Sequence, residues 1–362
     1  MRILHVTDTY LPVVGGIEQM VHQLATRQSA AGHEVTVVTR APGECADTPF
    51  SVVRSGHVPP SLVRTTDQLH AHVSVWSPLA GAGLRAAARA GVPALATVHS
   101  SWRGLEPVVR TLAVTGGWAD PRVQWAAVSQ CAAEPVRRTL HPDGGVLIVP
   151  NAVDADLWRP GPRDLHPGEL VVVSTLRMAR RKRPLHLVDL LAEAADRMPP
   201  GIRLRAVLVG DGPLLERVRA RAHRRDLNLT LPGRLDHPGL RKVLATADVY
   251  VAPADLETFG LAALEARCAG LVVLGKRHTG VADLVEDGVT GLLADDDQGL
   301  TRHLIELAGD PWRLTQMRHQ VRTTPARFDW DSVLTRHEDA YALSAERAGA
   351  PAHTPALARR YA

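Results

Sequence analysis

The sequence has little cysteine and no long apolar run. Three cysteines occur in 362 residues, Cys45, Cys131 and Cys268, and none belongs to a C-x-x-C pair. This odd, widely spaced set indicates neither a disulfide framework nor a zinc site, and it fits reduced thiols in a cytoplasmic protein. No stretch reaches the roughly 18 apolar residues that a membrane-spanning helix needs. The N-terminus is typical of a β-strand and not of a signal peptide, because Asp8 ends its apolar run early.

Other motifs that the sequence lacks narrow the kinds of ligand that the protein is expected to bind. A dinucleotide site would need Gly-x-Gly-x-x-Gly after the first strand, where this chain has only the pair Gly15-Gly16. No Asp-x-Asp run or His/Cys cluster suited to a divalent metal is apparent, and we interpret the loop residues Asp295–Asp297 as a solvated turn. The net charge of +4 is too small to indicate a nucleic-acid binder, but it suits an anionic substrate or membrane surface. We therefore expect no metal, no cofactor and no nucleic-acid partner.

Strand-like and helix-like apolar segments alternate along the chain. The strands expected in the N-terminal half are Ile3–Val6, Val35–Thr39, Leu69–Val73, Ala94–Val98, Ala126–Ser129 and Val146–Val149, with helices at Ile17–Ala31, Leu79–Ala90 and Cys131–Leu140. The strands expected in the C-terminal half are Leu170–Ser174, Leu204–Val209, Leu227–Leu231, Val249–Ala252 and Leu271–Leu274, with helices at Pro184–Met198, Pro213–Arg225, Gly239–Thr246, Gly260–Ala269 and Val281–Glu286. This alternation predicts an α/β fold with two Rossmann-like domains, whose parallel sheets face each other across a cleft.

A proline-rich segment sets the domain boundaries. Residues 154–168 hold Pro160, Pro162 and Pro167, which indicate an irregular linker. The linker separates an N-terminal domain, residues 1–153, from a C-terminal domain, residues 169–330. Residues 331–362 are expected to form a last helix, Ser332–Ala348, followed by a frayed tail.

Two glutamates follow a predicted strand of the C-terminal domain. The strand ends near Pro253, Glu257 lies in the next loop, and Glu265 lies one to two turns into a helix that begins near Gly260. Ligands of open α/β sheets bind at the carboxyl ends of the strands, and the N–H groups of a helix N-terminus attract phosphate. Because carboxylates repel phosphate, we expect the two glutamates to face hydroxyl groups of a sugar or ribose.

This segment resembles the donor-binding motif of the retaining, family-4 type glycosyltransferases. Their hallmark is two glutamates separated by seven residues with Phe-Gly between them, as in Glu257, Phe259-Gly260 and Glu265 here. The resemblance extends over nearly the whole chain and implies the glycosyltransferase-B fold, with the acceptor on the N-terminal domain and a nucleotide-sugar on the C-terminal one. It also implies that the last helix crosses back to the N-terminal domain.

Basic residues follow the first predicted strand of the C-terminal domain. Preorganised cations can stabilise a departing diphosphate without a metal, and Arg177 and Lys182 have the spacing of the family's diphosphate clamp. We expect Arg180, Arg181 and Arg183 to be solvated instead.

The resemblance extends to other site residues. It places Gly15 and Gly16 near the donor phosphate, where a backbone without side chains permits close approach, and it places His99 beside the transferred sugar. The catalytic residues that it implies are His99, Arg177, Lys182 and Glu257. The donor-binding residues that it implies are Gly15, Gly16, Arg177, Lys182, Arg234, Leu235, Glu257, Thr258, Phe259, Gly260, Leu261 and Glu265.

The implied function is transfer of a hexose from a nucleotide-diphosphate sugar to a hydroxyl acceptor, with retention and without a metal. The acceptor stays open between a lipid, a glycan, a polyol and a natural product. Trp102–Gln124 is a candidate acceptor wall, with Trp102, Arg103, Arg110 and Trp118. The expected location is the cytoplasm, with peripheral contact to the inner membrane face left open. Alternatives are a nucleotide-sugar epimerase of the same fold, a nicotinamide-dependent oxidoreductase and a non-catalytic binding protein.

Overall fold

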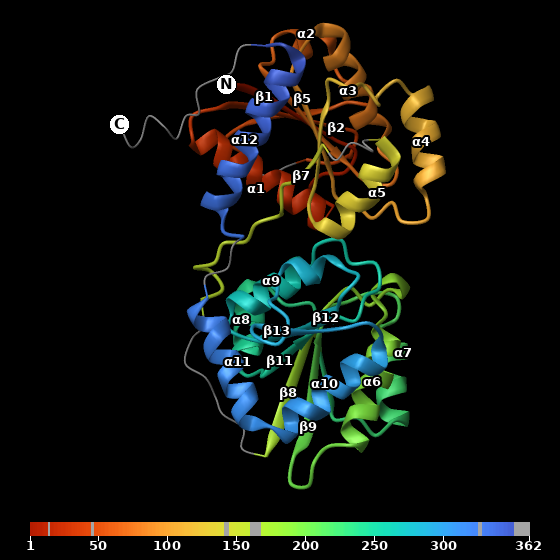
Figure 1. Cartoon of the computed structure of the whole chain (residues 1–362), viewed down its shortest axis with the longest axis vertical. Coiled ribbons are helices and arrows are strands. Elements are labelled where there is room, and N and C mark those ends of the chain that lie inside the picture. The colour runs from red at the N-terminus through yellow and green to blue at the C-terminus, as the bar shows by residue number, and fades with distance from the viewer. Residues whose placement is uncertain (14, 45–46, 141–144, 160–167, 325–327, 351–362) are drawn as a thin grey trace. The chain divides into compact units, whose positions relative to one another are not determined.

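The structure is a computed structural model that describes residues 1–13, 15–44, 47–140, 145–159, 168–324 and 328–350. The chain divides into two compact units, of which the first holds Met1–Ala152 and the helix that begins at Trp330, and the second holds Val153–Asp329 (Figure 1). Most of the predicted linker and the predicted frayed tail lie outside the described residues. Each unit contains one parallel sheet with helices, so the predicted α/β class is confirmed.

The first unit is built on a seven-stranded parallel sheet of order β3-β2-β1-β4-β5-β6-β7. Its elements are β1 (Arg2–Thr7), α1 (Gly16–Ala30), β2 (Glu34–Thr39), β3 (Ser51–Arg54), α2 (Pro60–Arg64), β4 (Gln68–Val73), α3 (Pro78–Ala90), β5 (Ala94–Val98), α4 (Glu106–Thr115), β6 (Gln124–Ala127), α5 (Gln130–Leu140), β7 (Val146–Ile148) and α12 (Trp330–Ala348). The elements β3, α2 and α4 were not predicted, and β6 lies two residues before the predicted strand.

Two helices from opposite ends of the chain cover one face of this sheet. Because successive strand residues point to opposite faces, Ile3 of β1 packs with Val21 of α1 and Tyr341 of α12 in one core. Val6, on the other face of β1, lies against Gly83 of α3. Figure 1 shows α12 in blue beside the red α1. The last helix is therefore part of the first unit.

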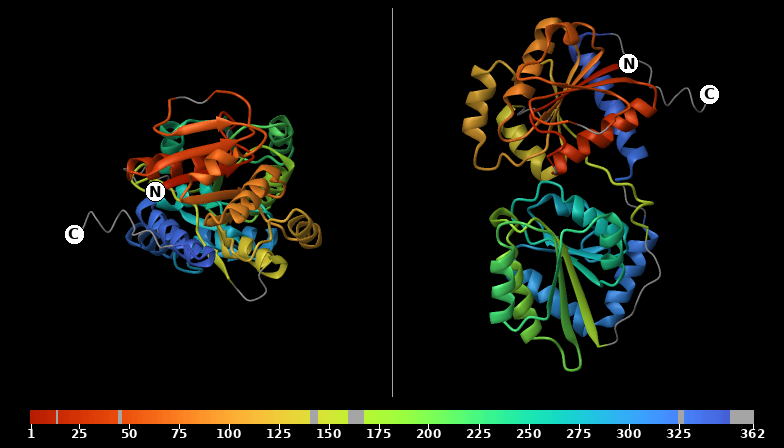
Figure 2. Two further views of the ribbon diagram at one scale, coloured as in Figure 1. Left: turned by 90° about the horizontal axis from the view of Figure 1, so that it is seen from above. Right: turned by 180° about the vertical axis from the view of Figure 1, so that it is seen from behind.

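The second unit has a six-stranded parallel sheet of order β10-β9-β8-β11-β12-β13. Its elements are β8 (Glu169–Thr175), η1 (Arg180–Lys182), α6 (Pro184–Asp196), β9 (Arg203–Val209), α7 (Leu215–Arg224), β10 (Leu229–Gly233), α8 (His237–Ala245), β11 (Val249–Val251), α9 (Leu261–Cys268), β12 (Val272–Lys276), η2 (Gly280–Asp283), β13 (Gly291–Ala294), α10 (Asp297–Gly309) and α11 (Pro311–Thr323). Figure 2 shows the helices on both faces of this sheet from behind.

The structure corrects two predictions in the second unit. The expected helix Val281–Glu286 is instead the short 3₁₀ turn η2. The expected solvated turn Asp295–Asp297 is exposed at Asp295 and Asp296 but leads directly into α10, which begins at Asp297: the Asp296 side chain caps the helix by accepting a hydrogen bond from the Gly299 N–H at 2.8 Å. Aspartate is a favoured N-cap because its carboxylate satisfies a free N–H of the first turn.

In each sheet, successive strands are added toward one edge from the first strand and then toward the other edge, so the strand order has one switch point. In the first unit that point lies between β1 and β4, and in the second it lies between β8 and β11. Ligands of open α/β sheets bind beside the carboxyl ends of the strands at such points. Among the described residues, no helix has the length and apolar character needed to cross a bilayer.

Candidate functional site

The candidate donor site lies at the switch point of the second unit. The loop after β8 carries Arg177 and Lys182, and the loop after β11 carries Glu257. Because β8 and β11 are adjacent and parallel, both loops leave the sheet at the same edge. The two predicted groups, which are 75 residues apart in the chain, therefore meet: the Lys182 ammonium donates to the Glu257 carboxylate at 2.5 Å.

The cations of the β8 loop have different surroundings. Lys182 and Glu257 are partly shielded, with side chains 29% and 22% exposed. The Arg177 side chain is exposed, and it makes no hydrogen bond or ion pair with the part of the chain that the structure describes. Arg177 is thus a free cation beside a paired one, and both can meet an anionic ligand.

Arg183 is not the solvated residue that we predicted. Its guanidinium forms two parallel hydrogen bonds of 2.8 Å to the Asp297 carboxylate, and its Nε lies 3.0 Å from Asp255. The hydrogen bonds that Arg183 donates to the Asp297 carboxylate raise the pKa of its guanidinium above the ordinary value. By contrast, Arg180 and Arg181 are exposed, as expected.

A buried lysine completes this ion network. Lys276, at the end of β12, is 3% exposed. Its ammonium donates to Asp255 and lies 2.7 Å from Asp297. Burial raises the pKa of Asp297, but the hydrogen bonds from Arg183 and Lys276 outweigh that effect and leave its pKa below the ordinary value. Two cations and two carboxylates thereby tie together the loops that follow β8, β11, β12 and β13.

Sequence reasoning missed this network. Lys276 was visible only as a charged residue at the end of an apolar strand, and its partner Asp297 lies 21 residues further on. A charge that ends a buried strand is a signal that could have been used, because a buried ammonium requires anionic partners.

The second predicted glutamate lies on α9, which begins after Gly260. Gly260 has a φ of 95°, in the left-handed region that glycine adopts most readily. Glu265 lies one turn further, and burial raises the pKa of its carboxyl to about 7. No described side chain pairs with this carboxylate. A half-buried carboxylate without a partner is suited to accept hydrogen bonds from hydroxyl groups of a ligand.

A close backbone contact holds the Glu257 loop in place. The Gly280 N–H donates to the Glu257 carbonyl at 2.8 Å. A Cβ on Gly280 would lie 2.1 Å from the Thr258 carbonyl oxygen, so no larger residue fits there. The predicted donor residue Phe259 is 3% exposed, and its ring packs edge-on against Phe328 at 5.6 Å. Phe259 therefore offers a ligand its backbone and not its ring.

Comparison with known proteins decides the family. The model for Glycosyltransferase Family 4 matches residues 14–157, and the model for Glycosyl transferases group 1 matches residues 162–324. The D-inositol 3-phosphate glycosyltransferase of Actinosynnema mirum is 30% identical over 342 residues, which cover 77% of this chain and 80% of that protein. This chain belongs to the family-4 type glycosyltransferases.

Other relatives of this glycosyltransferase span nearly its whole length. The glycogen synthase of Mycobacterium tuberculosis is 27% identical over 402 residues, covering 96% of this chain and 95% of that protein. The structure of Anabaena Alr3699/HepE in complex with UDP has a TM-score of 0.75 at 19% identity, covering 94% of this chain and 99% of that one. The predicted glycosyltransferase-B fold is thereby confirmed.

The other residues predicted for the donor site of the glycosyltransferase lie at the ends of elements in both units. Leu261 is the first residue of α9, directly after Gly260. Arg234 and Leu235 follow β10 at the same edge of the sheet, and Arg234 is exposed. Gly15 and Gly16 begin α1 in the first unit. The roles of these residues stay predictions.

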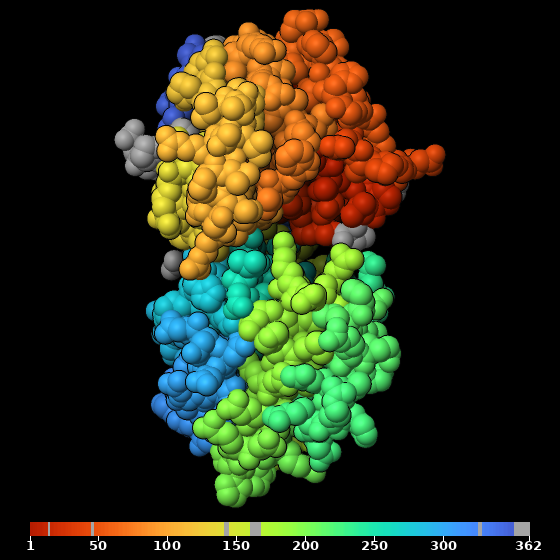
Figure 3. All heavy atoms as spheres, turned by 90° about the vertical axis from the view of Figure 1, so that its right-hand side faces the viewer, coloured from red at the N-terminus to blue at the C-terminus, as the bar shows by residue number. Residues whose placement is uncertain are grey.

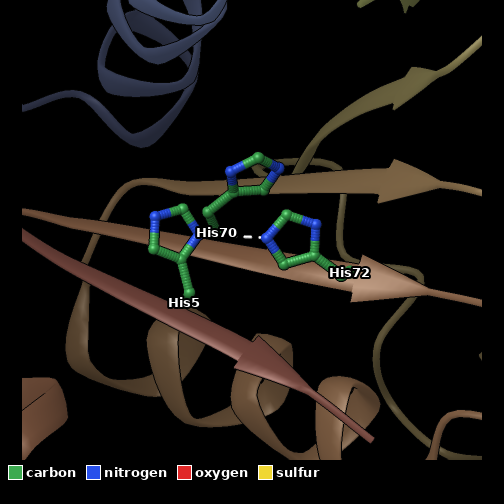
Figure 4. Close-up of side chains that lie close together, drawn as sticks. All are labelled: His5, His70 and His72. Atoms are coloured by element: carbon green, nitrogen blue, oxygen red, sulfur yellow. Dashed lines mark hydrogen bonds between the residues drawn. The ribbon is translucent and has the colours of Figure 1, made fainter. Parts of the chain in front are cut away.

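His99 of the glycosyltransferase follows β5 and belongs to a histidine cluster that we did not predict. His5, His70 and His72 each offer a ring nitrogen, and these nitrogens lie within 4.8 Å of one another (Figure 4). The rings of His72 and His99 have centroids 5.2 Å apart. The cluster forms because parallel register aligns His5 with His70, and because His70 and His72 point to the same face of β4. The sequence, in which we found no His/Cys cluster suited to a divalent metal, gave no sign of this grouping.

The first unit of the glycosyltransferase also has an apolar cavity of about 250 Å³. It lies beside the carboxyl end of β4, and Trp102, Trp118 and Leu112 are among its lining residues. Figure 3 shows the face of this unit on which α4 lies, coloured golden orange. Two of the predicted wall residues, Trp102 and Trp118, thus line the cavity. Arg103 and Arg110 are exposed and do not.

Proposed function

We propose that this chain transfers a hexose from a nucleotide-diphosphate sugar to a hydroxyl acceptor, with retention of the anomeric configuration. One observation carries the proposal: Lys182 and Glu257 form an ion pair at the switch point between β8 and β11, in the loops that also carry Arg177 and lead into the helix of Glu265. Cations there suit a diphosphate, and carboxylates suit the hydroxyls on either side of it.

The ion pair of Lys182 and Glu257 suggests how the donor is received. The diphosphate competes for the Lys182 ammonium, and the Glu257 carboxylate then accepts hydrogen bonds from sugar hydroxyls. Glu265 accepts hydrogen bonds from the ribose diol. Arg177 joins Lys182 in stabilising the charge that develops on the leaving diphosphate. No metal enters this scheme.

The proposed chemistry takes place on one face of the sugar. The bond from the anomeric carbon to the diphosphate oxygen breaks, and the bond to the acceptor oxygen forms on the same face. The acceptor's proton passes to the departing diphosphate oxygen, which serves as the base. His99 is proposed to line the transferred sugar.

A screen followed by product analysis tests the donor side. Thermal shift with UDP, GDP and ADP is expected to identify the preferred base, because a ligand stabilises the folded state by RT ln(1 + [L]/Kd). An α-linked donor is then expected to give an α-linked product, as shown by the coupling of the anomeric proton in NMR. Activity is expected to persist in EDTA. A β-linked product, or loss of activity in EDTA that Mg²⁺ restores, would contradict the proposal.

The same assay separates transfer from epimerisation. A glycosyltransferase needs an acceptor for product formation, apart from slow hydrolysis of the donor. Turnover of the nucleotide-sugar to its epimer without any acceptor would support the epimerase alternative instead.

For the acceptor, we propose a molecule with an apolar part that occupies the cavity beside β4. The walls are mainly apolar, and the lining residue Trp76 is 66% exposed. Arg85, the cation on the wall, donates to the Gly116 carbonyl at 2.6 Å. That bond engages Arg85 within the protein, so the cavity favours an apolar group over a phosphate.

Two substitutions on α4 test this acceptor site. Leu112 lines the cavity, whereas Val114 lies on the same helix, is 65% exposed and does not line it. Octyl glucoside serves as the probe, and binding is followed through the fluorescence of the tryptophans. Leu112→Gln is expected to weaken binding several-fold, by roughly 1 kcal/mol of lost apolar contact, and Val114→Gln is expected to leave it unchanged. Equal effects of the two variants would refute the assignment.

A further inference from the structure

A hydrogen-bonded run of histidines crosses the sheet of the first unit toward its carboxyl edge. His5 Nε2 lies 2.7 Å from Gln28 Oε1, and His5 Nδ1 lies 3.0 Å from His72 Nε2. His72 Nδ1 in turn lies 3.0 Å from His99 Nε2. The run starts at Gln28 on α1 and ends at His99, directly after β5.

All of these histidines are neutral at physiological pH. Burial lowers the pKa of His5 to about 4 and that of His99 to about 3. Burial, followed by the neighbouring histidines, lowers the pKa of His70 and His72 well below the ordinary value. A neutral imidazole has one donor and one acceptor nitrogen. Each hydrogen bond of the run therefore has a direction, and fixing one of them fixes all the others.

The Gln28 amide sets that direction. Its Nε2 donates to the Tyr341 hydroxyl at 2.9 Å, so its Oε1 accepts from His5 Nε2–H. His5 Nδ1 then accepts from His72 Nε2–H, and His72 Nδ1 accepts from His99 Nε2–H. The remaining nitrogen of the run, His99 Nδ1, is left with a lone pair.

The Tyr341 branch has the same polarity. The Tyr341 hydroxyl oxygen accepts from Gln28, and the hydroxyl proton is left without an acceptor unless Tyr341 donates it to His70 Nδ1, at 3.0 Å. His70 Nε2–H then donates to the Thr97 hydroxyl, at 2.8 Å. A single amide thus specifies the tautomers of four histidines.

The orphaned atom at the end of the run supports this direction. His99 Nδ1 is buried and has no hydrogen-bond partner within the described residues. If the Gln28 amide were turned over, every tautomer of the run would reverse, and His99 Nδ1 would carry an unpaired N–H. A buried N–H without a partner is rarer in proteins than a buried acceptor without one. The polarity with a lone pair on Nδ1 is therefore favoured.

We propose that Gln28, His5 and His72 are positioning residues that hold His99 in the Nε2–H tautomer, so that its Nδ1, which is buried and unpartnered in the free protein, accepts a hydrogen bond from a hydroxyl of the sugar substrate once the donor is bound. The proposal rests on the proposed function for the identity of that hydroxyl. The tautomers follow from the hydrogen bonds of the free protein alone.

The same histidines are not arranged as a vacant metal site. Both ring nitrogens of His5, His70 and His72 already have hydrogen-bond partners. A divalent ion would have to break several of these bonds, and none of the partners is a carboxylate that could balance its charge. The hydrogen-bonded network satisfies the buried nitrogens without an ion.

Long-range ¹H–¹⁵N correlation spectra of the uniformly ¹⁵N-labelled chain test the tautomers directly. His5, His70, His72 and His99 are expected as Nε2–H. His337 is expected as Nδ1–H, because its Nδ1 lies 2.8 Å from the Val333 carbonyl, and it serves as an internal reference. A His99 in the Nδ1–H form would overturn the proposal. So would stoichiometric uptake of Zn²⁺ that shifts the resonances of His5, His70 and His72.

A matched pair of variants tests the role of Gln28. Gln28→Met removes the amide that sets the direction, and it is expected to give His99 a mixture of tautomers while His337 is unchanged. Gln124→Met makes the same change at another buried glutamine of the unit, whose Nε2 donates to the Trp125 and Gly145 carbonyls, outside the run. It is expected to leave His99 as Nε2–H. Identical His99 spectra in the two variants would refute the proposal.

Measurements with substrate distinguish a failure of the tautomer proposal from a failure of the proposed function. Adding a nucleotide-hexose is expected to shift the His99 Nδ1 resonance, whereas the nucleoside diphosphate alone is not. Gln28→Met is expected to lower kcat about tenfold, as the loss of one neutral hydrogen bond gives, with unchanged affinity for the diphosphate. Correct tautomers without any sugar transfer would overturn the proposed function and leave the tautomer assignment intact. Transfer with an unshifted His99 resonance would overturn the ligand contact.

Discussion

The buried Glu265 carboxylate lowers the stability of the folded protein, and its proposed role in ligand binding explains why it is there. Its pKa rises from 4.5 to about 7 because burial disfavours the carboxylate. An acid with a raised pKa in the folded state costs nothing below pH 4.5, where it is protonated in both states. Stability is then lost as the pH rises, and the loss is complete above pH 7. Glu265→Gln should therefore stabilise the protein at pH 8 and not at pH 4.5.

The size of this effect follows from the same shift. A rise from 4.5 to about 7 corresponds to about 3 kcal/mol. Because Glu265 is partly accessible to solvent, screening reduces the expected gain to about 1–2 kcal/mol. One kcal/mol raises Tm by about 2–4 °C in a unit of this size.

The assay combines stability with binding. Thermal melts of the wild type and Glu265→Gln are compared at pH 4.5 and pH 8, with Glu216→Gln as a control, because Glu216 is an exposed residue of α7 in the same unit. The gain at pH 8 should be accompanied by weaker binding of the nucleoside diphosphate in calorimetry. A variant with unchanged Tm at pH 8, or with wild-type affinity for the diphosphate, would refute the reasoning.

Three further predictions concern neighbouring residues. Arg177→Ala and Lys182→Ala should each lower kcat by about 10²-fold, because each removes a cation proposed to stabilise the charge on the departing diphosphate; near-normal turnover in both would remove them from the mechanism. Glu257→Ala should impair sugar transfer but spare calorimetric binding of the nucleoside diphosphate, and a large loss of that binding would contradict its assignment to the sugar. Lys276→Met should lower the free energy of unfolding in urea by about 1–3 kcal/mol, because Asp255 and Asp297 lose a buried partner; Lys242→Met, on the surface of α8, is the control and should change little.

The local sequence pattern was enough to predict the strands and loops that carry the candidate donor site. Apolar periodicity placed the strands β8 and β11, and the loops after them carried Lys182 and Glu257 to one edge of a parallel sheet. These features depend on residues close in sequence, on the period of a strand and on the rule that parallel strands end together. They could therefore be inferred without coordinates, as could the fold class.

Tertiary structure decided which charges are available to a ligand. Nothing in the sequence distinguishes Arg183 from Arg180 and Arg181, because all three belong to one basic run. Arg183 alone of these meets Asp297, which lies 114 residues away. The histidine run is also invisible locally, because Gln28, His5, His72 and His99 come from four different elements. Sequence fixes periodicity and the ends of elements, whereas pairing between distant side chains depends on strand order and register, which only the folded chain defines.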